Sequence, residues 1–262
     1  MKKINKTTYS FALANAIKLL KKNKIILDNI EFIALLGSAR EKEYIPNYSD
    51  LDLLLIIKSD DAGAIEKNIL LAIKNICAIL SKKYLIKISF LTHTIKDFLG
   101  YVEYEYLRHY SLGRVLYGDK NSFLKFFANI LSKKKPNRKE LRRQMCNAIA
   151  HARFNLVRKY VSFNKFNTNV YSQQLLKLFI DNLFEISDWR LIADEIWCSS
   201  KKEIAQKISE KSNSQFKTVV EKSYEYRKGW NDKQVPIKEL ELFFIESIGF
   251  VNDCVRDLKK KI

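Results

Sequence analysis

Two stretches decide how the first part of the chain folds: Ile33-Ala34-Leu35-Leu36-Gly37-Ser38 and Ser49-Asp50-Leu51-Asp52-Leu53-Leu54-Leu55-Ile56-Ile57. Both are short, almost continuous apolar runs, a pattern typical of strands that are buried on both faces. Residues 41–49 between them contain Pro46 and Asn47, which favour a loop. Side chains two positions apart on a strand point to the same face, so we expect Asp50 and Asp52 to lie side by side.

A glycine close to two carboxylates has a chemical use. Gly37 lets the backbone approach a phosphate, and the Ser38 hydroxyl and nearby N–H groups can donate hydrogen bonds to the phosphate oxygens. Asp50 and Asp52 can hold Mg²⁺ against a triphosphate. The alternatives are a solvated turn for the aspartates and an ordinary capped turn for Gly37-Ser38. Asp52 favours the functional interpretation, because a carboxylate inside an apolar strand needs a partner or an ion.

The remaining periodicity predicts an α+β fold. Helices are expected over residues 10–21, 61–80 and 95–110, and strands over 30–36, 51–57, 84–91 and 114–117. After Gly118 only helical spacing continues, with helices expected over residues 138–162, 170–194, 201–211, 214–229 and 237–260. The sequence therefore predicts a small mixed-sheet domain over 1–120 and an all-α helical bundle domain over 121–262, with the boundary region at 118–136.

Composition limits the class of protein and its partners. The 262 residues are 47% apolar, which predicts a globular protein, and carry a formal charge of +18. This charge favours phosphate-rich partners, although a lysine-rich proteome would also explain it. The four cysteines form no C-x-x-C pair, so neither a zinc site nor a disulfide framework is indicated. No segment has the roughly 20 apolar residues of a membrane span, so we expect a cytoplasmic protein with no membrane partner.

Gly37-Ser38, followed after a short gap by Asp50-x-Asp52 and flanked by apolar strands, resembles the DNA polymerase β-like nucleotidyltransferase superfamily. The chain is most similar to bacterial minimal nucleotidyltransferases with a helical C-terminal domain, such as the aminoglycoside adenylyltransferases. The resemblance is specific over residues 30–58 and only architectural after Gly118. It implies transfer of a nucleoside monophosphate from an NTP, with ATP as the expected donor and Mg²⁺ as the cofactor.

The resemblance also implies roles for single residues. Asp50 and Asp52 are the expected catalytic metal ligands. The expected nucleotide-binding residues are Gly37, Ser38, Arg40, Ser49 and Lys87.

The superfamily usually has a third carboxylate on the next strand, where this chain has Lys87 and Ser89. Three explanations are open. The base comes from elsewhere, the acceptor needs no base, or the domain binds a nucleotide without turning it over. The other acids considered as bases are Glu103 and Glu105 on the following helix, and Glu185 and Asp188 in the helical domain.

The charge balance also bears on the acceptor. Residues 138–162 form a basic amphipathic helix, which is either a phosphate-contacting surface or the solvated face of a bundle. RNA, for example a tRNA end, fits the charge of +18 better than a polycationic aminoglycoside, which requires an acidic cleft. The expected acceptor is therefore RNA. The alternatives are a catalytically silent nucleotide- or RNA-binding or antitoxin-like module, and an aminoglycoside adenylyltransferase-like enzyme.

Overall fold

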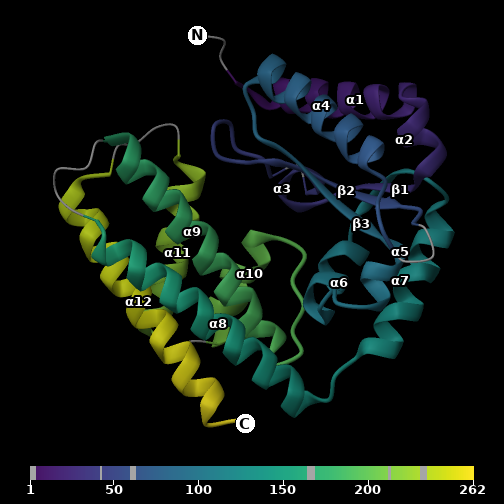
Figure 1. Ribbon diagram of the computed structural model, residues 1–262. Helices are drawn as coiled ribbons and strands as arrows, with labels where there is room; N and C mark the ends of the chain where they lie inside the picture. The colour runs from purple at the N-terminus through teal and green to yellow at the C-terminus, as the bar shows by residue number, and fades with distance from the viewer. Residues whose placement is uncertain (1–3, 42, 60–62, 164–168, 212–213, 231–234) are drawn as a thin grey trace. The chain divides into compact units, whose positions relative to one another are not determined.

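The computed structural model describes residues 4–41, 43–59, 63–163, 169–211, 214–230 and 235–262. Contacts between residues divide the chain into two compact units, Met1–Lys135 and Pro136–Ile262. The first contains a small mixed sheet and the second is built from helices (Figure 1). The predicted α+β fold class, a mixed-sheet part followed by a helical part, is confirmed.

The sheet of the first unit has four strands. They are β1 (Ile30–Leu35), β2 (Leu51–Ile57), β3 (Ile88–Thr94) and β4 (Arg114–Tyr117), in the spatial order β3-β2-β1-β4. The pair β2/β3 is parallel, whereas β1/β2 and β1/β4 are antiparallel. The central strands β1 and β2 are those with the most continuous apolar sequence, because both of their faces are covered.

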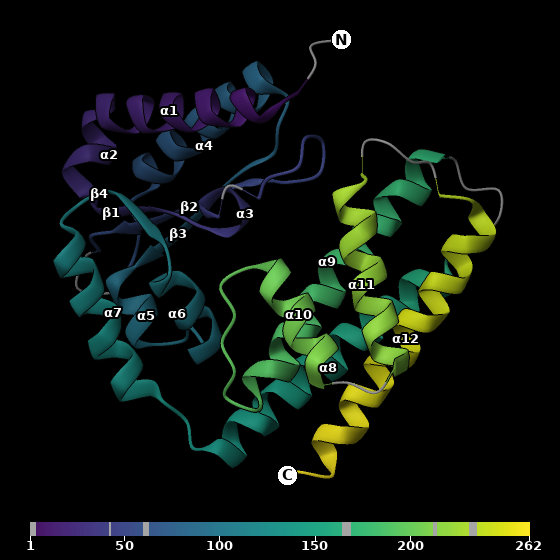
Figure 2. The same ribbon diagram turned by 180° about the vertical axis from the view of Figure 1, so that it is seen from behind.

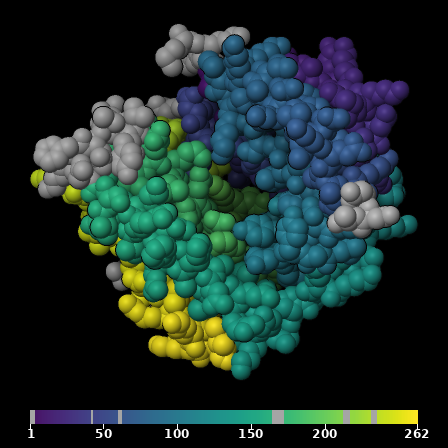
Figure 3. Space-filling model, in the orientation of Figure 1, coloured from purple at the N-terminus to yellow at the C-terminus, as the bar shows by residue number. Residues whose placement is uncertain are grey.

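Helices cover both faces of this sheet (Figures 1 and 2). On one face lie α1 (Lys6–Lys22), α2 (Lys24–Asn29) and α4 (Lys67–Tyr84), whose apolar side chains pack with Leu53 and Leu55 of β2. In the space-filling view the purple atoms of α1 and the blue atoms of α4 lie next to each other at the top of the view (Figure 3). On the other face lie α5 (Ile95–Leu99), α6 (Tyr104–Ser111) and α7 (Lys120–Lys134), which pack with Leu54 and Ile56.

This division of β2 determines where its aspartates point. Leu54 and Ile56 face α5–α7, so by alternation Asp52 belongs to the same face. Gly37 begins the short helix α3 (Gly37–Arg40), which follows β1 directly. The functional pattern of the sequence thus lies at one end of the two central strands.

The second unit is a bundle of five described helices. They are α8 (Arg138–Val161), α9 (Asn169–Ile192), α10 (Lys201–Lys211), α11 (Ser214–Lys228) and α12 (Ile237–Lys259). Phenylalanine side chains of α9 and α12, among them Phe179 and Phe244 with ring centroids 4.2 Å apart, lie in its core. No described helix in either unit is long and apolar enough to cross a membrane.

Several expected boundaries differ from the structure. Phe123 and Phe127 of α7 pack with Phe32 of β1, and the contacts divide the chain at 135/136, inside the boundary region expected at 118–136. The helix expected over 95–110 is two helices, because a turn at Gly100 separates α5 from α6. The helix expected over 61–80 is α4, which begins at Lys67 and extends to Tyr84, so the next strand lies at 88–94. Residues 61 and 62 of that prediction lie outside the described residues.

Candidate functional site

The end of β1 and the start of β2 bring Gly37 and Asp52 together. The strands are antiparallel, with Leu35 opposite Leu53, and the Leu36 N–H donates a hydrogen bond of 3.0 Å to the Asp52 carbonyl. Gly37 has a φ of +60°, and a Cβ atom added to it would lie 3.2 Å from Asp52 Oδ2. Both observations favour glycine at this position, where the backbone is exposed beside a carboxylate.

Lys87 lies beside Asp50 at the start of the neighbouring parallel strands. Lys87 Nζ donates a hydrogen bond of 2.7 Å to Asp50 Oδ2, and the Leu51 N–H bonds to the Lys87 carbonyl at 2.9 Å. The Lys87 side chain is 72% exposed, whereas that of Asp50 is 22% exposed. The ammonium group therefore covers one oxygen of Asp50 from the solvent side.

Ser89 is the register partner of Asp52 on β3. The positions opposite both aspartates therefore hold a lysine and a serine and no third acid. Among the described residues no group of three or more His, Cys, Asp or Glu side chains could hold a metal ion. Two carboxylates do fit one Mg²⁺, because this ion takes one or two carboxylates and completes its shell with phosphate oxygens and water.

The loop before Asp50 is held by buried hydrogen bonds. Ser49 is buried, its Oγ accepts a hydrogen bond of 2.9 Å from the Ile45 N–H, and its carbonyl accepts one of 2.7 Å from the Tyr9 hydroxyl. Burial, together with the charge of Asp50, raises the pKa of Tyr9 to about 12. Sequence reasoning missed Tyr9, whose only signal is a tyrosine on the buried face of α1.

Ser38 and Arg40 lie on α3. Ser38 is half-buried, and its carbonyl accepts a hydrogen bond of 2.9 Å from the Glu43 N–H. Arg40 Nη1 donates a hydrogen bond of 2.7 Å to the Leu112 carbonyl, and Arg40 also forms an ion pair with Glu41. These contacts tie α3 to the turn after α6, so the role of Arg40 in nucleotide binding remains a prediction.

Glu103 and Glu105 lie together at the start of α6. Glu103 is exposed at the helix N-cap, whereas Glu105 is 3% exposed, and its Oε2 has no hydrogen-bond partner among the described residues. Burial raises the pKa of Glu105 to about 7, helped by Glu103 and opposed by His109. The two acids therefore lie side by side in the structure. Their catalytic role stays a prediction.

Three of the seven Arg and Lys side chains of α8 form ion pairs within the second unit. Arg143 Nη2 lies 2.9 Å from Glu140 Oε2, Arg142 Nη2 lies 3.6 Å from Asp194 Oδ1, and Arg138 Nε lies 3.8 Å from Glu195 Oε2. These contacts favour the interpretation of this face as part of a packed bundle.

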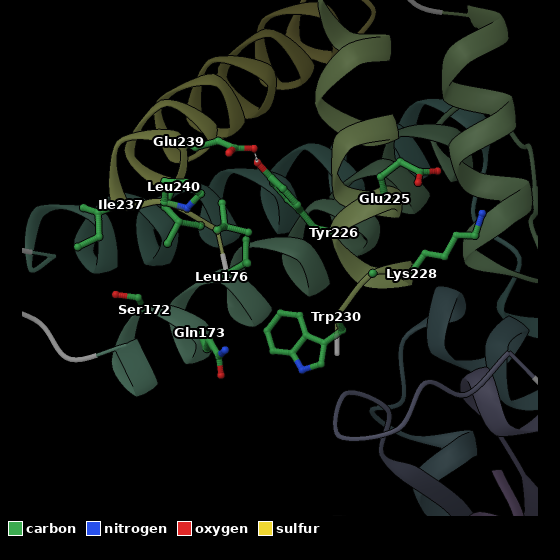
Figure 4. Close-up of a pocket in the computed structure, with 13 residues that line it drawn as sticks. Ser172, Gln173, Leu176, Glu225, Tyr226, Lys228, Trp230, Ile237, Glu239 and Leu240 are labelled. Carbon is green, nitrogen blue, oxygen red and sulfur yellow. Dashed lines mark hydrogen bonds between the residues drawn. The ribbon is translucent and has the colours of Figure 1, made fainter. Parts of the chain in front are cut away.

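A cavity of about 980 Å³ lies in the second unit, between α9, the end of α11 and the start of α12. Figure 4 shows the Tyr226 hydroxyl directed at Glu239, with a hydrogen bond of 2.5 Å. Trp230 and Leu176 also line this cavity, which Glu225 makes more acidic. Ser172, Gln173 and Lys228 add further polar groups to its lining. A cavity of this volume can hold a small molecule.

Comparisons with known proteins point to the same fold. No family model and no curated protein matches the chain in sequence. A solved structure that matches is a spectinomycin adenyltransferase from Enterococcus faecialis, determined with ATP and spectinomycin. It shares 11% identity and a TM-score of 0.55, over 94% of this chain and 99% of that chain. At this identity the likeness shows the fold, and the resemblance recognised in the sequence is confirmed at that level.

Proposed function

We propose that this chain, which has the fold of the nucleotidyltransferases, transfers a nucleoside monophosphate from an NTP to an acceptor. The observation that carries the proposal is the position of Gly37, the exposed first residue of α3, where an added Cβ atom would lie 3.2 Å from Asp52 Oδ2. A phosphate can approach the backbone there, directly beside a carboxylate that binds the accompanying metal. ATP is the proposed donor, as it is the nucleotide in the structure of the spectinomycin adenyltransferase.

Each residue of the site has a proposed part. Gly37 and Ser38 bind the triphosphate, with Arg40 and Ser49 fixing the segments on either side. Asp50 and Asp52 hold Mg²⁺, which supplies charge neutralisation and orients phosphate oxygens when bound. The acceptor proton is taken by Glu105, assisted by Glu103, because a carboxyl with a pKa of about 7 can accept a proton near neutral pH.

The proposed acceptor is RNA. The support is the charge of +18, because cationic side chains that contact phosphates supply much of the affinity for nucleic acid. A cationic small molecule such as an aminoglycoside is the alternative acceptor. It is supported by Glu225 and Glu239 at the cavity of the second unit, and by the spectinomycin in the related structure.

Label transfer from α-³²P-ATP tests the proposal. Purified chain, Mg²⁺ and either total small RNA or spectinomycin are incubated, and the labelled product is separated on a gel or by chromatography. Asp50→Asn combined with Asp52→Asn is expected to abolish labelling, and Glu105→Gln to slow it by about 10²–10⁴-fold. Asp28→Asn, an exposed acid on α2, is the control and should label as the wild type does. Undiminished labelling by the double variant would contradict the proposal.

A second candidate function rests on Lys87. An ammonium 2.7 Å from Asp50 Oδ2 provides positive charge without a metal and repels a second cation. The chain would then bind a nucleotide without turnover. Calorimetric titration with ATP and EDTA distinguishes the two functions, because the silent module binds ATP without metal and labels no acceptor under any metal tried.

A further inference from the structure

Asp194 is the centre of a charge network in the second unit. Four cations reach its carboxylate, with N···O distances of 2.8 Å from Arg190, 3.6 Å from Arg142, 3.5 Å from Lys211 and 4.0 Å from Lys261. These side chains come from α8, α9, α10 and the segment after α12. One carboxylate cannot neutralise four cations, so a positive potential remains where they converge.

Asp257 only partly corrects this imbalance. It forms ion pairs with Arg190 and, at 3.0 Å, with Lys261, both of which also reach Asp194. These partners lower the pKa of Asp194 and of Asp257 against the effect of burial, so both carboxylates are charged at neutral pH. The network therefore has four cations for two anions, even with every acid ionised.

Four side chains of this network, those of Arg190, Lys211, Asp257 and Lys261, line a pocket of about 430 Å³. Five of its lining residues are cationic and two are acidic. The cationic ones are Arg190, Lys211, Arg256, Lys260 and Lys261, and the acidic ones are Asp253 and Asp257. Leu191, Ile208 and Phe250 give it an apolar wall. Burial raises the pKa of Cys254, a further lining residue, to about 12, so its thiol adds no negative charge.

We propose that this pocket binds the phosphate group of a small phosphorylated molecule. A doubly charged oxyanion would offset the excess of cations, and the ammonium groups of Lys211 and Lys260 are donors suited to its oxygens. The apolar wall would take the uncharged part of the ligand. The volume suits one phosphate with a small substituent and is too small for a nucleic acid duplex.

Two cationic lining residues with exposed side chains offer a clean test. Lys211 is on α10 and Lys260 directly follows α12, and both are exposed. The test variant is Lys211→Gln combined with Lys260→Gln. The matched control is Lys202→Gln combined with Lys259→Gln, which removes the same charge from exposed positions on the same two helices without touching the pocket lining. Far-UV circular dichroism shows whether each variant folds, and Lys260→Gln alone replaces the double variant where it does not.

Binding is measured by calorimetry on the full chain, in a phosphate-free buffer of low ionic strength. The probes are inorganic phosphate, ribose 5-phosphate and unphosphorylated ribose. We expect saturable binding of one equivalent of both phosphates and none of ribose. The pocket variant should raise the dissociation constant at least tenfold, and the control less than twofold.

Three outcomes would overturn the proposal. They are the absence of saturable phosphate binding by the wild type, equal weakening by the pocket and control variants, and binding of ribose as tight as that of ribose 5-phosphate. Equal weakening would show a diffuse effect of net charge and no discrete site. In the first of these outcomes, binding of a single-stranded RNA can be measured as well. If the wild type binds the RNA and the pocket variant does not, the pocket is an RNA site and the proposal of a small phosphorylated ligand is wrong.

Discussion

Lys87 Nζ lies 2.7 Å from Asp50 Oδ2, and Lys87 directly precedes β3, the strand on which the sequence resemblance implies a third carboxylate. The two residues meet because β2 and β3 are parallel and in register, with Leu51 opposite Ile88. A cation at this distance neutralises one of the two carboxylates that would hold a metal. The proposed metal site therefore contains one positive charge that belongs to the protein itself.

Removing this charge should strengthen metal binding. Lys87→Ala frees Asp50 Oδ2 for a divalent cation, and since the Lys87 side chain is 72% exposed, we expect only about a two- to fivefold lower dissociation constant for the metal. Mn²⁺ binding in the presence of a non-hydrolysable ATP analogue, followed by electron paramagnetic resonance, measures it directly. Lys82→Ala on the exposed side of α4 is the control. Weaker Mn²⁺ binding by Lys87→Ala would show that Lys87 supports the metal site.

Gly37 should not tolerate a side chain. Gly37→Ala places a methyl group 3.2 Å from Asp52 Oδ2 and forces alanine to a φ of +60°, which costs about 1–2 kcal/mol of stability. It also displaces the carboxylate, so ATP affinity should fall together with the free energy of unfolding. Urea denaturation and calorimetry measure the two effects.

Gly249 provides the opposite case. It lies within α12, and a Cβ atom added to it meets nothing within 4 Å. Gly249→Ala should therefore stabilise the chain by about 0.5–1 kcal/mol and leave ATP affinity unchanged. If Gly249→Ala lowered the free energy of unfolding as much as Gly37→Ala does, the loss at Gly37 could not be attributed to its positive φ.

The regular elements followed from sequence wherever one periodicity covers the whole element. The apolar run Leu51–Ile57 is β2 to the residue, and the helix expected over 201–211 is α10. The strand predicted over 84–91 begins too early, because α4 continues to Tyr84 and its C-cap is Leu85 at a φ of +56°. The Leu85 N–H bonds to the Ser81 carbonyl. Because leucine rarely adopts a positive φ, no local pattern predicts that the helix ends there.

Within the candidate site, some contacts could likewise be predicted from the sequence and others could not. The neighbouring positions of Gly37 and Asp52, and of Asp50 and Lys87, follow from strand order and alternation alone. The contact of Arg40 with the Leu112 carbonyl spans 72 positions of the sequence, and that of Tyr9 with Ser49 spans 40. Such contacts depend on how helices pack on the sheet, which local periodicity does not encode.

Tyr9 should stabilise the segment that carries Asp50. Tyr9→Phe removes the hydroxyl that donates a hydrogen bond of 2.7 Å to the Ser49 carbonyl. The buried carbonyl is then left without this donor, which lowers the free energy of unfolding by about 1–3 kcal/mol. We expect a lower free energy of unfolding and weaker ATP binding. Tyr84→Phe, at the half-buried end of α4, is the control. Unchanged stability of Tyr9→Phe would show that water replaces the hydroxyl.

Glu105 should make the first unit less stable as the pH rises. Burial raises its pKa from 4.5 to about 7, so the folded protein binds more protons than the unfolded protein between these values. The stability that the neutral carboxyl contributes is complete below about pH 4.5 and is lost as the pH rises through about 7.

Glu105→Gln keeps the shape of the side chain and removes its charge. At pH 8 the variant should be more stable than the wild type by on the order of 1–3 kcal/mol, and at pH 5 the two should differ little. Urea denaturation at both pH values measures this, with Glu66→Gln at the exposed N-cap of α4 as the control. Equal stability of Glu105→Gln and the wild type at pH 8 would mean that the carboxylate is solvated or paired when charged. In that case its pKa would lie near the ordinary value, and Glu105 would lose the property that makes it a proposed base.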